Sequence, residues 1–245
     1  MALLEIKQLK KYFYDIHAVD GVDLEVQPGE LLGLIGPNGS GKTTLFDCIT
    51  GMQRPTAGQV VFNRRTLIGL TPDQIARQGI SRTFQVLQIF PEMSVRESML
   101  LAAQEFQGTL LTRLLHRRED AAVARAEHLL RMLGLWHMRA ESAGNLSYGQ
   151  QKLLDFGMAL MGQPSLVLLD EPASGVNPTI IGSMGQYILD LNAQGLTFVI
   201  IEHNMDFLMS LCRRVVVLNQ GSQIATGTPA EIRANPAVLR AYFGG

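Results

Sequence analysis

The segment from Gly36 to Thr43 places the strongest constraint on the fold of this chain. It reads Gly-Pro-Asn-Gly-Ser-Gly-Lys-Thr, which fits the pattern G-x-x-x-x-G-K-[ST], and it stands between an apolar run, Leu31 to Ile35, and a helix predicted to start near Lys42. Glycines let the backbone turn back so that its N–H groups face inward, where they can bind phosphate oxygens at the positive end of a helix. The segment therefore predicts a nucleotide site. A glycine-rich turn without a ligand is disfavoured, because strand, loop, lysine and hydroxyl follow in order.

The residues of this loop have separate predicted roles. The side chain of Lys42 would reach the β and γ phosphates of a nucleoside triphosphate, and the Thr43 hydroxyl would ligate Mg²⁺. The predicted phosphate contacts cover nine consecutive positions, namely Gly36, Pro37, Asn38, Gly39, Ser40, Gly41, Lys42, Thr43 and Thr44.

The composition excludes some classes of partner. With 245 residues, of which 47% are hydrophobic and 18% charged, the chain is long enough for one large α/β domain or for a core with a subdomain. Its net charge is −1, so no basic field indicates nucleic acid and no polybasic tail indicates anionic lipid. Partners are therefore expected at specific surfaces, and no nucleic-acid partner is expected.

Sequence signals for export or membrane insertion are missing. Residues 1–11 carry charges at Glu5 and Lys7 and have no apolar core or cleavage site of a signal peptide. No apolar stretch approaches the ~18 residues that cross a bilayer. We expect a soluble chain on the reducing, ATP-rich side of a membrane. Cys48 and Cys212 lack metal-ligand spacing and are predicted to be small core residues.

Two strand patterns predict two kinds of sheet. Alternating Val22, Leu24 and Val26, with a further strand over Gln59 to Phe62, predict an antiparallel sheet beside the nucleotide site. Continuous apolar runs separated by helical segments are typical of strands buried on both faces of a parallel sheet. These runs cover residues 166–169, 198–201 and 215–218, and a turn over 219–222 with a return strand over 223–226 follows the last of them.

The stretch from about residue 91 to residue 162 interrupts this α/β pattern and is predicted to be mostly helical. One face of its longest predicted helix is apolar, with Ala122, Ala126, Leu129, Leu130 and Leu133. Within the stretch, Leu110 to Glu119 combines four leucines with three arginines. A helix on the subdomain surface is the preferred interpretation of that segment, and an amphipathic contact with a partner or with lipid headgroups is the alternative.

Two carboxylates, Asp170 and Glu171, follow the predicted strand 166–169. A parallel strand would present them at the carboxyl edge of the sheet, where ligands bind in open α/β folds. Asp170 is suited to hold Mg²⁺ through its water shell, and Glu171 could polarise the water that attacks the γ-phosphate. Strands often end in solvated acids, so the acidic pair alone does not indicate a nucleotide site. It does so here because the chain also contains the phosphate-binding loop.

Between the two nucleotide motifs lies Leu146-Ser147-Tyr148-Gly149-Gln150, which resembles the L-S-G-G-Q signature of the ATP-binding cassette (ABC) ATPases. Gln85 in Thr-Phe-Gln resembles the glutamine-loop residue of that family, and His203 in Ile-Glu-His resembles its switch histidine. Phe13 stands where family members stack an aromatic ring on adenine, and its neighbours Tyr12 and Tyr14 are the alternatives. The resemblance runs through essentially the whole chain.

The resemblance implies a role for each matching residue. Glu171 would be the general base, while His203 would hold it and the water in line. The implied catalytic residues are Glu171, His203, Gln85 and Lys42. The implied ligands of Mg²⁺ are Thr43, Gln85 and Asp170. Ser147, Gly149 and Gln150 would bind the ATP that is held by an opposite subunit.

The resemblance also implies a fold and partners. The expected fold is α/β, with a P-loop NTPase (RecA-like) core, an antiparallel β subdomain and an inserted helical subdomain. Residues 1–245 would form a single ABC ATPase domain, in which 1–90 and 163–245 build the core with the β subdomain and 91–162 the helical subdomain. Two ATP molecules would close a head-to-tail dimer with a second ATPase subunit. Membrane permease subunits would dock near Gln85 to Met93, placing the chain peripherally on the cytoplasmic face of the cell membrane.

Tyr148 and Asn177 depart from the general pattern of the ABC family. Both variants resemble sequences of the branch of the family that energises uptake of branched-chain amino acids, and the segments Gly227 to Ile232 and 235–244 strengthen that resemblance. That branch works indirectly with a periplasmic binding protein. Another ABC system, for urea import or lipopolysaccharide export, is the nearer alternative, and a soluble ABC ATPase without a transport role is a further one.

Overall fold

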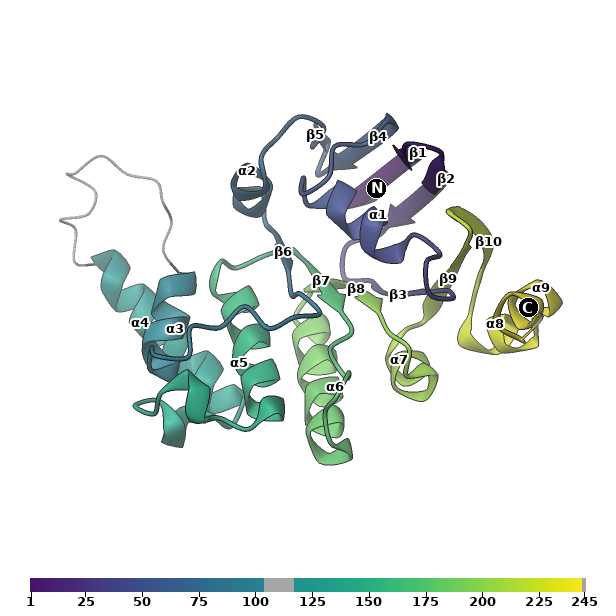
Figure 1. Cartoon of the computed structure of the whole chain (residues 1–245). Coiled ribbons are helices and arrows are strands. Elements are labelled where there is room, and N and C mark those ends of the chain that lie inside the picture. The colour runs from purple at the N-terminus through teal and green to yellow at the C-terminus, as the bar shows by residue number, and fades with distance from the viewer. Residues whose placement is uncertain (104–116, 244–245) are drawn as a thin grey trace.

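The computed structural model describes residues 1–103 and 117–243, and its main sheet has six strands in the order β10-β9-β3-β8-β7-β6 (Figure 1). All neighbouring strands are parallel except β9 and β10, which form the hairpin that the sequence predicts. The strands are β3 (Leu31–Ile35), β6 (Ile80–Arg82), β7 (Leu166–Asp170), β8 (Thr197–Ile201), β9 (Arg214–Asn219) and β10 (Ser222–Gly227). The predicted parallel sheet is therefore confirmed.

Successive residues of the central strands enter two different hydrophobic clusters. Leu32 and Leu34 face one cluster, while Leu31 and Ile35 face the other. The alternation follows from the two-residue period of a strand, whose side chains point to opposite faces. Because both faces are covered, every position of β3, β7 and β8 is buried, which explains their unbroken apolar runs.

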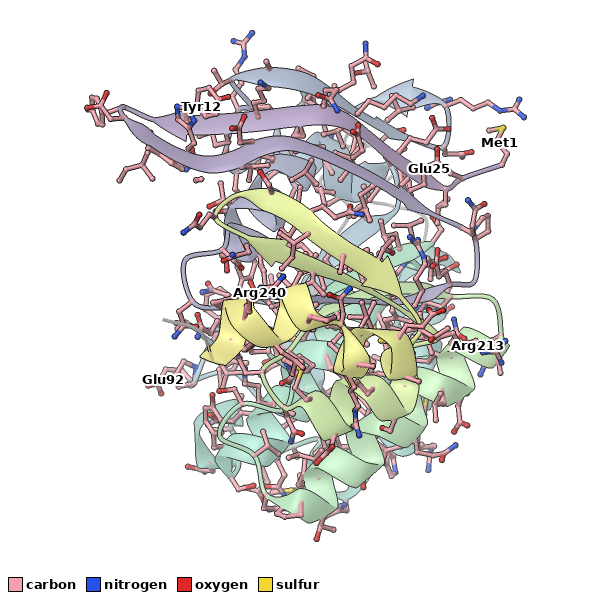
Figure 2. All side chains as sticks on the ribbon, turned by 90° about the vertical axis from the view of Figure 1, so that its right-hand side faces the viewer. Met1, Tyr12, Glu25, Glu92, Arg213 and Arg240 are labelled. Atoms are coloured by element: carbon pink, nitrogen blue, oxygen red, sulfur yellow. The ribbon has the colours of Figure 1, made fainter. Side chains whose placement is uncertain are left out.

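A second, antiparallel sheet of four strands covers one face, in the order β2-β1-β4-β5. Its strands are β1 (Leu4–Phe13), β2 (Ile16–Val26), β4 (Ala57–Phe62) and β5 (Arg65–Thr66). Helix α1 (Lys42–Ile49) lies between the two sheets, and its Leu45, Phe46 and Ile49 are fully buried in the shared cluster. Figure 2 shows this sheet, with the labelled Tyr12 and Glu25, as a layer above the rest of the molecule.

Helices cover the other face of the main sheet. They are α5 (Tyr148–Met161), α6 (Pro178–Ala193) and α7 (Met205–Leu211). Two short helices, α8 (Pro229–Ala234) and α9 (Pro236–Phe243), end the described chain beside β10 (Figure 2). The short helix α2 (Pro72–Arg77) precedes β6.

Between β6 and β7 the chain inserts helices rather than strands. The insertion contains α3 (Val95–Ala102), α4 (Arg117–Met132), two 3₁₀ turns, η1 (Trp136–Met138) and η2 (Ala143–Asn145), and finally α5. Of the predicted apolar face, Ala126, Leu129, Leu130 and Leu133 are buried and Ala122 is half-buried. The Leu110 to Glu119 prediction lies outside the described residues except for Arg117–Glu119, which begin α4.

Two further expectations can be compared with the structure. Both cysteines are buried, and burial raises the pKa of Cys48 to about 11 and that of Cys212 to about 12, so neither forms a reactive thiolate at neutral pH. Among residues 1–103 and 117–243, no helix has both the length and the hydropathy required of a membrane-crossing segment.

Candidate nucleotide site

The phosphate-binding loop connects the buried β3 to α1, as the sequence predicts. Its turns require glycine at Gly36 (φ 155) and Gly41 (φ 100), where a Cβ atom would collide with the carbonyl oxygens of Leu218 and Ala18, respectively. The loop is thereby pressed against the ends of β9 and β2. Gly41 also begins α1, whose first-turn N–H groups are the donors that an anion can use.

Lys42 is held over this loop although it is almost entirely buried, at 6% exposure. Its Nζ donates to the carbonyl oxygens of Gly36 at 2.8 Å and Pro37 at 2.9 Å. Burial lowers the pKa of Lys42, an effect that the charges of Glu171 and Asp170 oppose. A buried ammonium that is bonded to neutral carbonyls is poised for an anionic partner, so the loop fits a nucleotide phosphate.

Of the four predicted catalytic residues, His203 and Gln85 meet at Glu171, which directly follows β7, whereas Lys42 lies on the phosphate-binding loop. Its Oε1 lies 3.1 Å from Nε2 of His203, and its Oε2 accepts a hydrogen bond from Nε2 of Gln85 at 3.1 Å. Glu171 has a left-handed backbone, with φ at 50°, a conformation uncommon for a residue other than glycine. The Glu171 carboxylate therefore lies between the two residues that the sequence assigns to water and γ-phosphate.

Asp170, at the end of β7, is ion-paired to a residue that the sequence reasoning missed. Arg82, at the end of β6, donates from Nη2 to Asp170 Oδ2 at 2.9 Å and from Nη1 to Asp47 Oδ1 at 2.6 Å. The Arg82 and Asp170 side chains are only 5% and 3% exposed. Burial raises the pKa of Asp170 and Arg82 counteracts that effect. Arg82 thereby ties β7 to α1, the helix of the phosphate-binding loop.

Glu202 is a second functional residue without a motif of its own. It is 2% exposed; its Oε1 accepts from Ala173 N at 2.6 Å and its Oε2 from His203 N at 3.0 Å and Asn204 N at 3.1 Å. Burial raises the pKa of Glu202, while these three backbone N–H groups stabilise its charged form. Glu202 thus fixes the loop that carries His203 relative to the loop that follows the acidic pair.

The donor set predicted for Mg²⁺ consists of hard oxygen atoms, as Mg²⁺ requires. Thr43 lies exposed in the first turn of α1, and Asp170 ends β7 at the same edge of the sheet. Gln85 uses Nε2 toward Glu171, so its Oε1 is the atom that would face a metal. The residues therefore fit a magnesium ion that also binds phosphate oxygens.

The signature segment forms the start of α5. Ser147 caps the helix: its Oγ accepts from Gln150 N at 3.4 Å, and Gln150 Oε1 accepts from Ser147 N at 2.9 Å. A Cβ at Gly149 would press on Val176 and Ile180, while the Tyr148 ring packs against Gly175. The signature thus touches the loop after the acidic pair, yet in Figure 1 the start of α5 lies well apart from α1.

The three aromatic candidates for adenine stacking are not equivalent. Tyr12 is committed elsewhere, since its hydroxyl donates to Asp20 Oδ1 at 2.6 Å and its ring stacks on His17 at a centroid distance of 3.9 Å. Phe13 is 37% exposed, with Lys11 Nζ 4.6 Å from the centre of its ring. Tyr14 projects fully into solvent at the turn between β1 and β2. Phe13 is therefore the ring that is both held and accessible.

The fold and the loop define a P-loop nucleoside triphosphatase. Residues 19–174 match a family described as ABC transporter, a range that includes the phosphate-binding loop, Gln85, the signature and the acidic pair. A second family, described as branched-chain amino acid ATP-binding cassette transporter, matches residues 222–245. The chain belongs to the ABC transporter family and is an ATP-binding, ATP-hydrolysing subunit.

Relatives of the chain are transport ATP-binding proteins and ATP-binding cassettes. The high-affinity branched-chain amino acid transport ATP-binding protein LivG of Salmonella typhimurium is 41% identical, over 99% of this chain and 98% of that protein. The corresponding protein BraF of Pseudomonas aeruginosa is 39% identical over the same shares. A crystal structure of a nucleotide-free ATP-binding cassette from an ABC transporter is 35% identical, covers 100% of both chains and superposes with a TM-score of 0.89. The ADP conformation of such a cassette gives the same values.

The Arg82 ion pairs generate a stability prediction. In Arg82→Met, Asp170 would remain buried without its cation, so the free energy of unfolding is expected to fall by about 3 kcal/mol or more. Urea denaturation followed by circular dichroism measures the change. The matched control is Arg233→Met, which breaks an ion pair to Asp206 between side chains 58% and 93% exposed and is expected to leave stability nearly unchanged. Equal effects of the two substitutions would contradict the assigned role of Arg82.

Proposed function

We propose that this chain is the ATPase subunit of an importer for branched-chain amino acids. Two independent matches support the proposal. LivG and BraF match along nearly the whole chain, and a separate family, described as branched-chain amino acid ATP-binding cassette transporter, matches the C-terminal residues 222–245. The ATPase chemistry belongs to the whole family, so the C-terminal match is what favours this cargo over other cargoes.

In the proposed mechanism, Glu171 is the general base that takes a proton from the attacking water. His203 and Gln85, each 3.1 Å from the Glu171 carboxylate, orient that water and sense the γ-phosphate. Lys42 leaves its two backbone carbonyls to bind the β and γ phosphates. Bound Mg²⁺ neutralises charge on the phosphates, and Thr43, Gln85 and Asp170 are the residues that would hold it.

A second copy of an ATPase subunit completes each site in this proposal. Ser147, Gly149 and Gln150 form a capped helix start, which suits an anion, but this start lies apart from the phosphate-binding loop of its own chain. A head-to-tail dimer would bring each signature segment onto the ATP of the partner subunit. Residues 91–162 would then move as a helical subdomain against a core formed by 1–90 and 163–245.

The proposed membrane partners are permease subunits that dock near Gln85 to Met93. This segment exposes two large apolar side chains, Val86 at 73% and Phe90 at 54%, beside the helical insertion. The chain would work at the cytoplasmic face of the cell membrane, with a periplasmic binding protein delivering the amino acid from outside. Closure of the dimer would pull on the permease through this segment.

The aromatic assignment gives one prediction. Phe13→Ala should raise the Kd for ATP about tenfold, because stacking of a base on an aromatic ring contributes about 1–3 kcal/mol. Tyr14→Ala, at the adjacent exposed ring, should leave the Kd unchanged. Isothermal titration calorimetry with both variants measures the affinities, and the reverse pattern would reassign the adenine platform to Tyr14.

The general base gives a second prediction. Glu171→Gln keeps the size of the side chain but removes its basicity, so hydrolysis should fall about a hundredfold or more. The variant should still bind ATP and should accumulate as a dimer in size-exclusion chromatography. Glu25→Gln, at an exposed position of β2, is the control and should behave as the parent. Parent-like turnover by Glu171→Gln would overturn the assignment of the base.

The cargo is tested by uptake of labelled leucine into source cells that lack this chain and are complemented with the parent or with Glu171→Gln. Only the parent should restore uptake, and unlabelled isoleucine and valine, but not urea, should compete. If uptake is indifferent to the deletion once a second uptake system is excluded, the cargo assignment is wrong, whereas the ATPase assignment stands.

A further inference from the structure

Helix α5 carries two buried charged residues that the mechanism above does not use. Lys152 and Asp155 are 4% and 7% exposed, although they lie in the helix that begins with the signature segment. They are three residues apart, so both project from the same face of the helix. Burying two charges costs several kcal/mol and gives no reliable gain in stability over apolar residues of similar size. Their presence therefore calls for a function beyond packing.

Both residues face the loop that leads from β6 to α3 and contains Gln85. Lys152 Nζ donates to the backbone carbonyl oxygen of Gln85 at 3.2 Å. Burial raises the pKa of Asp155 to about 6, an effect that the charge of Lys152 opposes. The helix thus donates a hydrogen bond to the loop at Gln85.

The surroundings of Lys152 link it to the remaining parts of the site. Its Nζ lies 5.9 Å from the centre of the Tyr148 ring, which itself packs on Gly175 in the loop after the acidic pair. Lys152 and Asp155 line a small cavity together with Thr83, Pro172 and Met184. Thr83 in turn accepts a hydrogen bond from Asp170 N at 3.3 Å. The carboxylates of Glu171, Glu202 and Asp170 also act on Lys152 and oppose the lowering of its pKa by burial.

We propose that Lys152, with the charge of Asp155 beside it, is a positioning residue for ATP hydrolysis: it clamps the backbone of Gln85 to α5, so that Gln85 moves together with the signature segment. The proposal rests on the role assigned above to Gln85. From Ser147 to Lys152 the helix rises only about 8 Å, too short a distance for the helix to bend appreciably. A phosphate that engages Ser147 therefore shifts Lys152, and Lys152 shifts the Gln85 carbonyl. Because the Gln85 amide is bonded to Glu171, this shift reaches the proposed base, so the position of Glu171 responds to engagement of the signature.

The test compares Lys152→Met with Lys152→Arg in the purified full-length chain. Methionine fills the same space without a donor, so kcat for ATP hydrolysis should fall about tenfold or more while KM for ATP changes less than about twofold. Arginine keeps a cationic donor and should restore most of the rate. Lys7→Met, at an exposed lysine of β1, is the control and should match the parent. A fall in melting temperature with kcat unchanged would overturn the proposal, since it would show a purely structural role.

Gln85→Ala separates this proposal from the function on which it rests. The single variant should lower kcat, and adding Lys152→Met to it should cause little further loss. The reason is that Lys152 is proposed to act on hydrolysis only by positioning Gln85. If Gln85→Ala leaves kcat unchanged, the assigned role of Gln85 fails and the clamp fails with it. If Gln85→Ala lowers kcat but Lys152→Met lowers it by the same factor in both backgrounds, only the clamp is overturned.

Asp155→Asn is a second variant that tests the same proposal if Lys152→Met does not fold. Asparagine keeps the size of the side chain but removes the charge that acts on Lys152. The expected result is a lower kcat with KM nearly unchanged and with ATP affinity unchanged in calorimetry. A kcat equal to that of the parent, in a variant that circular dichroism shows to be folded, would count against the clamp.

Discussion

The parallel hydrogen-bond register of the central strands is the constraint on which the site depends. Asp170 is paired with Ile201, and Ile201 with Leu34, so the chain leaves β7, β8 and β3 at one level of the sheet. The backbone N–H of Glu171 continues the ladder by donating to the Ile201 carbonyl oxygen at 2.9 Å. The backbone register alone therefore places the acidic pair, His203 and the phosphate-binding loop at one edge of the sheet. Their proximity does not depend on contacts between their side chains.

Charge is distributed unevenly over that edge. Asp170 is neutralised by Arg82, and Glu202 is held by three backbone N–H groups, so both carboxylates are engaged in the structure. Glu171, by contrast, is bonded to a neutral amide and to an imidazole whose side chain is 43% exposed. The two adjacent acids therefore have different partners: a guanidinium beside Asp170, and an amide and an imidazole beside Glu171, the proposed base.

Much of this could be read from the sequence, and the omissions have one physical cause. The phosphate-binding loop and the apolar strands of the parallel sheet over 166–169, 198–201 and 215–218 are encoded by residues within a few positions of each other, so local patterns revealed them. Strands β1 and β6 carry no such apolar run and were not predicted. Arg82 and Lys152 were missed because their partners, Asp170 and Gln85, lie 88 and 67 residues away in the chain. A single arginine or lysine carries no periodic signal, and only the folded register shows what it faces. Asn177 has a local structural role, because its Oδ1 accepts from Ile180 N at 3.0 Å and caps α6.

The left-handed backbone of Glu171 lowers the stability of the fold at the residue that is proposed to act as the base. A residue with a side chain is destabilised there by about 1–2 kcal/mol, whereas glycine adopts the same angles freely. A screen that rewards heat resistance alone would therefore accept glycine at this position and remove the proposed base. Enrichment of such variants under thermal selection, and their disappearance when growth depends on transport, would mark residue 171 as a position maintained by turnover against the preference of the fold.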